Sequence, residues 1–85
     1  MTDEKPKIAG PWRLAGSDGD LEYHERKYVP GTYDAAASVI CCPPRCIWSA
    51  WCNDELLAEG DEHIDLGVAQ AKADAALRAQ GAVLQ

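Results

Sequence analysis

The alanine-rich segment at residues 66–80 constrains the fold of this chain more than any other feature of its sequence. Asp65 precedes it as an N-cap and Gly81 follows it as a C-cap, so the sequence predicts one helix between them. Asp74 and Arg78 stand at the i, i+4 spacing of an ion pair on its polar stripe. Because most of its other side chains are small, the helix can lie close to a sheet whose larger residues fill the space between the two layers.

Two hairpins are expected to supply that sheet. Residues 12–15 and 21–29 are strand-like and are joined by a turn rich in Gly and Asp, which tolerate the backbone of a tight hairpin. Residues 36–42 and 46–52 are also strand-like, and the Pro43-Pro44-Arg45 connection between them cannot be helical. The sequence therefore predicts an α+β fold, in which an antiparallel sheet of three to four strands is packed by one C-terminal helix.

The chain of 85 residues is long enough for one domain of modest size. Residues 1–10 are polar, of mixed charge and without periodicity, and are expected to form a flexible N-terminus. Residues 11–85 are expected to form a single α+β domain. No apolar run reaches the roughly 18 residues of a membrane span, and residues 1–10 lack the apolar core of a signal peptide. We therefore expect a cytoplasmic location and no association with a membrane.

Strand alternation in residues 46–52 places one Trp on each face of the sheet. Trp48 shares a face with Cys46, Ala50 and Cys52, whereas Trp51 lies on the opposite face with Ile47 and Ser49. This pattern indicates either an inner strand or a strand with one face packed on the helix and the other available to a partner.

Four cysteines fall within twelve residues: Cys41, Cys42, Cys46 and Cys52. Four thiolates can close a tetrahedral zinc site. However, the spacing lacks the paired C-x2-C turns of common zinc modules, and two prolines separate Cys42 from Cys46. We expect these residues to be buried thiols of the core and expect no metal or other cofactor. In a reducing compartment, a structural disulfide is the less favoured state. A zinc-binding structural or interaction module with all four as ligands is the alternative.

No catalytic motif stands out. His24 and His63 are the two histidines, and neither has the setting of a general base beside a nucleophile. Gly16 and Gly19 belong to a turn between strands and not to a phosphate-binding strand-to-helix loop. We expect the protein not to be an enzyme.

Negative charge is concentrated ahead of the helix. The formal net charge is −6, and no Lys or Arg occurs between Arg45 and Lys72. Such a balance repels phosphate backbones, so direct binding to nucleic acid is not expected. The simplest interpretation is a solvated loop or short strand, and the functional one is a surface that docks onto a basic protein with Trp51 as an apolar anchor. The six carboxylates in this segment belong to Asp54, Glu55, Glu59, Asp61, Glu62 and Asp65.

Three short motifs support a resemblance over residues 46–81. They are W-x2-W from Trp48 to Trp51, Leu-Ala-x-Gly from Leu57 to Gly60, and the alanine-rich run from Ala71 to Leu77. In these and in its size and charge, the chain resembles the small orphan proteins of bacterial viruses and mobile elements, including the acidic anti-CRISPR type. The resemblance implies binding to an effector complex and obstruction of its nucleic-acid or partner surface, without catalysis, and it assigns no functional residue.

These observations together predict a small acidic binding protein that inhibits or modulates a larger basic effector, such as a CRISPR-Cas complex. The protein is expected to act as a monomer or a homodimer. A viral origin would place it in the cytoplasm of the host.

Overall fold

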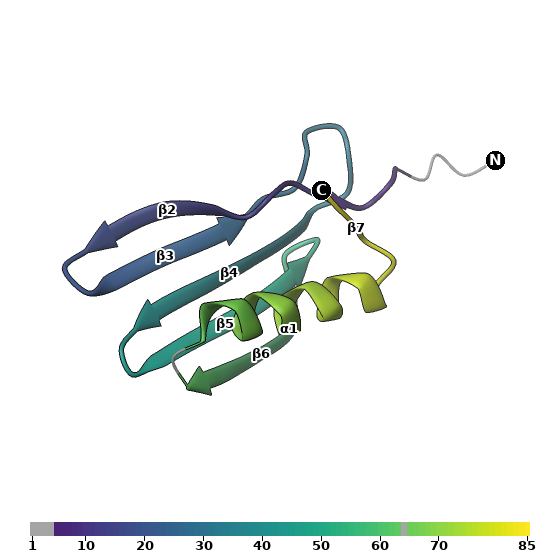
Figure 1. Ribbon diagram of the computed structural model, residues 1–85. Coiled ribbons are helices and arrows are strands. Elements are labelled where there is room, and N and C mark those ends of the chain that lie inside the picture. Colours follow the sequence, from purple (N-terminus) through teal and green to yellow (C-terminus); the bar gives the residue numbers. More distant parts are fainter. Residues whose placement is uncertain (1–4, 64) are drawn as a thin grey trace.

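The computed structural model describes residues 5–63 and 65–85 and has an α+β architecture (Figure 1). The α+β class, the antiparallel sheet and the single C-terminal helix are confirmed. The main sheet has five strands, so the expected number of three to four was too low. The chain visits them in spatial order, each antiparallel to the one before: β2 (Arg13–Asp18), β3 (Leu21–Arg26), β4 (Ala35–Cys42), β5 (Arg45–Cys52) and β6 (Glu55–His63).

The fifth strand is the acidic segment itself. Its turn from β5 holds Asn53 and Asp54 at φ 51° and 65°, the left-handed conformation that two-residue hairpin loops require. Asn and Asp tolerate this conformation better than most residues. Residues 55–63 therefore fold back and pair along β5 as an outer strand.

The helix α1 (Leu66–Ala79) begins after the expected N-cap Asp65, and its C-cap is Gln80, one residue before the expected Gly81. The Asp65 carboxylate accepts a hydrogen bond from the Val68 backbone N–H at 3.0 Å. At the other end Gly81 has φ 84°, and its N–H donates to the Arg78 carbonyl at 2.9 Å. The Ala82 N–H donates to the Leu77 carbonyl at 3.1 Å, which completes a Schellman motif.

Helix α1 covers one face of the sheet, over β4, β5 and β6 (Figure 1). Its buried residues are Ala69, Ala73 and Leu77, and the small alanines allow the close approach that the sequence predicts. Beneath them Trp48 is only 8% exposed. Its indole lies against Gly60 of β6, where a Cβ would stand 2.5 Å from the Trp48 Nε1 atom.

The two ends of the chain meet in a second, small sheet. Strand β1 (Ile8–Ala9) pairs in parallel with β7 (Val83–Leu84), the short strand that follows α1. The expected flexible segment therefore includes residues with regular backbone pairing, while its first four residues lie outside the described part of the chain.

A buried arginine holds these ends against the helix. Arg26, at the end of β3, donates to the Asp74 carboxylate of α1 at 2.7 Å and to the backbone carbonyls of Gly10 and Gln85. The expected partner of Asp74 was Arg78, but Asp74 pairs with Arg26. It also accepts a hydrogen bond from the Trp12 indole at 3.0 Å.

Candidate functional site

The face of the main sheet that points away from α1 carries large apolar side chains, and we call it the open face. Register places these side chains on β3, β4, β5 and β6, with Tyr23 beside Ile40 and Ile40 beside Ile47. The open face thus combines neighbouring aromatic and aliphatic groups from four strands. Its large apolar residues are 39–50% exposed: Tyr23, Ile40, Ile47, Trp51 and Leu56.

Trp51 lies on this face, as strand alternation predicts. It is 39% exposed, and its indole Nε1 donates to the Ser49 hydroxyl at 3.0 Å. The Ser49 and Ser38 hydroxyls are in turn hydrogen-bonded across the two central strands at 3.0 Å. The ring is therefore held in place by its polar edge while much of its apolar surface faces solvent.

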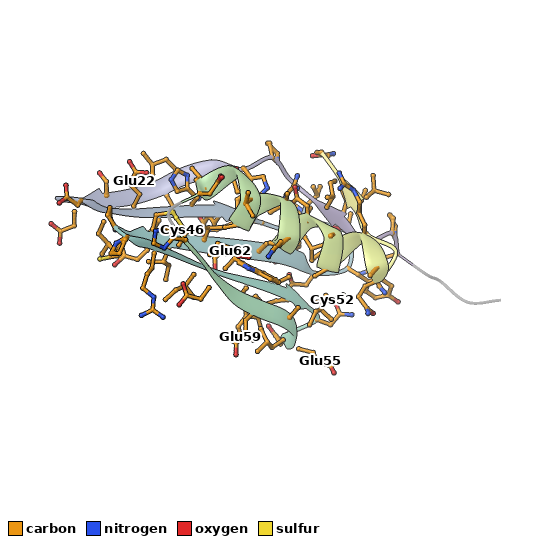
Figure 2. The ribbon with its side chains drawn as sticks, turned by 60° about the horizontal axis from the view of Figure 1, so that its bottom comes forward. Glu22, Cys46, Cys52, Glu55, Glu59 and Glu62 are labelled. Carbon is orange, nitrogen blue, oxygen red and sulfur yellow. A yellow bond between two sulfur atoms is a disulfide. The ribbon has the colours of Figure 1, made fainter. Side chains whose placement is uncertain are left out.

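The structure brings five of the six sequence-predicted carboxylates to one margin of the sheet, which we call the acidic edge. Asp54 lies in the turn before β6, and Glu55, Glu59, Asp61 and Glu62 follow along that outer strand. Figure 2 shows Glu55 and Glu59 on the outer side of β6, with Glu62 nearer to α1. The sixth residue, Asp65, serves as the helix N-cap instead.

Two carboxylates of the acidic edge are neutralised by the chain itself. Asp61 pairs with Arg45 of the neighbouring strand, and its hydrogen bond raises the pKa of the Arg45 guanidinium. Glu62, on the helix side of the sheet, pairs with Lys72 of α1.

The other three carboxylates of the acidic edge are not neutralised in this way. In the described residues, no Lys or Arg forms an ion pair with Asp54, Glu55 or Glu59. The negative surface is therefore smaller than its composition suggests, and it is centred on these three residues.

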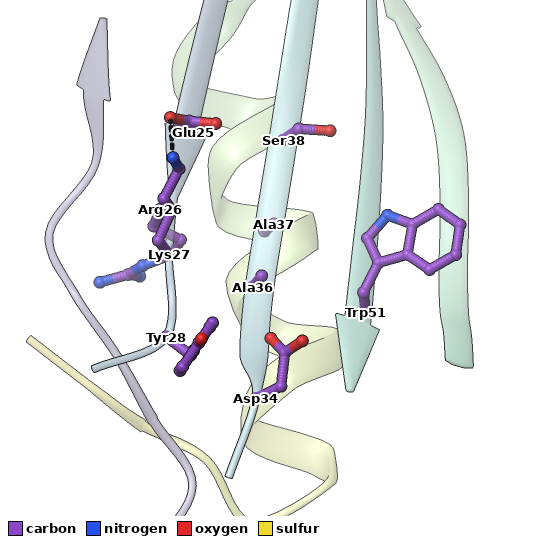
Figure 3. A pocket seen from close by; sticks show the side chains of 9 residues that line it. All are labelled: Glu25, Arg26, Lys27, Tyr28, Asp34, Ala36, Ala37, Ser38 and Trp51. Atoms are coloured by element: carbon purple, nitrogen blue, oxygen red, sulfur yellow. Dashed lines mark ion pairs between the residues drawn. The ribbon is translucent and has the colours of Figure 1, made fainter. Parts of the chain in front are cut away.

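A shallow pocket of about 410 Å³ lies at the end of the open face, near Asp54 (Figure 3). The Asp34 carboxylate, which precedes β4, has one oxygen that is buried without a hydrogen-bond partner among the described residues. Burial, and then the nearby charge of Asp54, raise the pKa of this carboxyl above its ordinary value. The lining residues are Glu25, Arg26, Lys27, Tyr28, Asp34, Ala36, Ala37, Ser38 and Trp51.

Sequence reasoning named Trp51 for this region and missed Asp34. Asp34 is a single acid between two strand-like segments, and no local pattern distinguishes it. The pocket around Asp34 is formed by Tyr28 from the loop after β3 and by Trp51 from β5, which the sheet brings together. Only the predicted pairing of 36–42 with 46–52 could have placed Asp34 near Trp51.

The four cysteines do not gather at one place. Cys41 and Cys46 form a disulfide between neighbouring strands, so the expectation of free thiols or metal ligands is wrong for this pair. The register puts them directly opposite each other, with Cα atoms 4.1 Å apart, which the linear spacing did not reveal. Cys46 and Cys52 are buried, as strand alternation predicts.

The remaining two cysteines are free thiols at different places: Cys42 is exposed, and Cys52 lies at the opposite end of β5 from Cys46 (Figure 2). The zinc alternative requires all four thiolates around one ion, and the sheet separates them. Within residues 5–63 and 65–85, no group of three or more His, Cys, Asp or Glu side chains is placed to hold a metal ion.

We also examined whether the helical part of the fold could span a membrane. Among the helices of the described chain, none combines the length and apolar character needed to cross a bilayer.

We compared the chain with protein-family models, with curated proteins and with solved structures, and none of the three comparisons gave a match.

Proposed function

We propose that this chain is a small non-enzymatic binding protein that docks onto a larger protein with a basic surface. One observation carries the proposal: exposed apolar side chains of the open face adjoin carboxylates that form no ion pair with Lys or Arg in the described chain. Glu59 lines a hollow together with Ile47, and Asp54 lies close enough to Asp34 of the pocket to affect its pKa. Glu55 is on the same outer strand, opposite Cys52. An uncovered apolar patch beside unneutralised charge is typical of protein interaction surfaces.

The two parts of this surface have different physical roles. Burial of Ile47 and Trp51 against a partner would supply affinity, at about 25 cal/mol per Å² of apolar area removed from water. The carboxylates would steer a positively charged partner and disfavour others, since long-range attraction mainly raises the association rate. The net charge of −6 favours a basic protein over a nucleic acid.

Neutralisation of charge tests this proposal with a matched control. The variant Glu55→Gln/Glu59→Gln removes two unpaired carboxylates of the acidic edge. The control Asp18→Asn/Asp20→Asn removes two exposed carboxylates at the β2–β3 turn, on the opposite edge of the sheet, and changes net charge equally. Asp61 and Glu62 are left intact because their substitution would break ion pairs within the chain.

Proteins retained by the immobilised chain are identified first. The dissociation constant of the retained protein is then measured for wild type and for each variant. We expect weaker binding and a smaller salt dependence for the acidic-edge variant, and unchanged binding for the control. Trp51→Ala should weaken binding with little effect on the salt dependence. Equal behaviour of the two charge variants would overturn the proposal.

Inhibition of a CRISPR-Cas effector is the most specific form of the proposal. It predicts that the chain binds the purified effector and reduces its association with target nucleic acid. The acidic-edge variant should lose this inhibition in parallel with its affinity. If binding to a basic partner is confirmed and no effector is inhibited, the general proposal stands without this specific form.

A further inference from the structure

The pocket at the end of the open face has an uneven charge distribution. At one end Glu25 accepts a hydrogen bond from Arg13 at 2.9 Å and lies 3.5 Å from the Lys27 ammonium, so that end already contains cations. Arg26 is turned into the opposite layer, where Asp74 neutralises it. The other end holds Asp34, which forms no ion pair in the described chain.

Within residues 5–63 and 65–85, the Asp34 carboxylate is therefore an acceptor without a donor. One of its oxygens is fully buried and lacks a hydrogen bond within the described residues, and the nearby carboxylate of Asp54 adds to burial in raising the pKa of this group. A carboxylate desolvated in this way costs free energy, and a donor brought by a ligand to its other oxygen, Oδ2, would recover part of that cost. Two neighbouring carboxylates would also attract the same cation.

Aromatic rings flank this carboxylate. Figure 3 shows Asp34 between the side chains of Tyr28 and Trp51, and all three line the pocket. Tyr28 is 48% exposed, and the indole of Trp51 is fixed by its bond to Ser49. Aromatic faces attract cations, and a planar guanidinium can stack on a ring while it donates to a carboxylate.

We propose that this pocket binds an arginine side chain of the partner, with Asp34 as the acceptor and Tyr28 and Trp51 as the stacking surfaces. This inference rests on the proposed function and specifies the chemistry of one contact. The guanidinium fits better than an ammonium because it offers several donors in one plane next to two aromatic rings.

A small-molecule titration tests the pocket without the partner. The probe is Nα-acetyl-arginine amide, and Nα-acetyl-citrulline amide is the matched uncharged compound. Backbone and indole N–H signals are followed by two-dimensional NMR on the full chain. We expect saturable shifts at the Trp51 indole and the Ala36 amide with the arginine compound, and none with the citrulline compound.

Variants assign the effect to the pocket. Asp34→Asn should weaken binding of the arginine compound about tenfold, the factor expected for one charge-assisted hydrogen bond. Trp51→Leu should also weaken binding, and it keeps the inference testable if Asp34→Asn unfolds. Asp18→Asn, on the opposite edge of the sheet, should leave the affinity unchanged.

Three outcomes would overturn the inference: no localised shifts, equal affinity of wild type and Asp34→Asn, or equal affinity for Nα-acetyl-lysine amide. Its failure is separable from failure of the proposed function. If the pocket binds no arginine but Glu55→Gln/Glu59→Gln still weakens partner binding, only the pocket assignment falls. If the arginine compound binds but Glu55→Gln/Glu59→Gln does not weaken partner binding, the proposed docking mode is wrong instead.

Discussion

The Arg26 guanidinium lies 2.7 Å from the Asp74 carboxylate, and the two side chains connect strand β3 to helix α1. Arg26 is 3% exposed and also lies over the Trp12 ring, 5.6 Å from its centroid. Its other two nitrogens, Nε and Nη2, donate to the carbonyls of Gly10 and Gln85. A buried charge is tolerated when its hydrogen-bonding capacity is met in this way.

Removal of one member of this pair should strongly destabilise the fold. We expect Arg26→Met to lower the free energy of unfolding by about 3–5 kcal/mol, because Asp74 is left without its cation. Asp74→Leu alone should have a comparable cost, and the double variant should lose less than the sum of the two. Urea unfolding measures all three. Lys27→Met, at the next position and largely exposed, is the control and should change stability by about 1 kcal/mol or less. If the double variant loses as much stability as the two single variants together, Arg26 and Asp74 are not energetically coupled.

A methyl group at Gly60 should be costly. Its Cβ would stand 2.5 Å from Nε1 and 2.7 Å from Cε2 of Trp48, closer than nonbonded atoms approach. Because Trp48 is packed beneath α1, we expect Gly60→Ala to lower stability by roughly 1–3 kcal/mol and to change the Trp fluorescence. Gly16→Ala is the matched control, since its Cβ would meet Tyr23 at an ordinary 3.7 Å. If the two variants are equally stable, Trp48 does not lie against Gly60 as described.

The Cys41–Cys46 disulfide should be detectable chemically and should have a modest effect on stability. Its two cysteines are five residues apart, and a loop this short gives a stabilisation of about 2 kcal/mol or less in the chain-entropy account. Under denaturing conditions an alkylating reagent should modify two cysteines before reduction and four after it. Cys41→Ala/Cys46→Ala should lower the unfolding midpoint, whereas the exposed Cys42→Ala should not. Four modified cysteines without a reductant would contradict the pairing.

The elements that sequence alone predicted correctly are those set by local chemistry. The helix ends were predictable because Asp65 and Gly81 satisfy backbone groups within a turn of their own positions. The positions of Trp48 and Trp51 on opposite faces follow from strand alternation, which also holds locally.

What the sequence did not show depends on contacts between distant positions. Strand β6 was ambiguous because carboxylates and a glycine are unusual in strands, and its extended form is fixed by pairing with β5 and by Trp48 against Gly60. The partner of Asp74 was mispredicted because helical spacing favours Arg78, whereas Arg26 is 48 positions away. The Asp34 pocket likewise exists only after the sheet is assembled.

Asp34 and Glu25, which line the same pocket, should make opposite contributions to the pH dependence of stability. Burial raises the pKa of Asp34 above its ordinary 3.8, so the unfolded chain loses this proton first and stability falls as pH rises through that window. The hydrogen bond from Arg13 lowers the pKa of Glu25 below its ordinary 4.5, so this group stabilises the fold above that value and the gain is lost as pH falls. As pH rises through these windows, the stability of Asp34→Asn should increase relative to that of wild type, because the variant lacks the destabilising ionisation. The stability of Glu25→Gln should decrease relative to that of wild type, because this variant lacks the stabilising one. Urea unfolding at closely spaced pH values measures both slopes. If the free energy of unfolding of both variants changes with pH as it does in wild type, Asp34 is not the unpartnered carboxylate on which arginine binding depends.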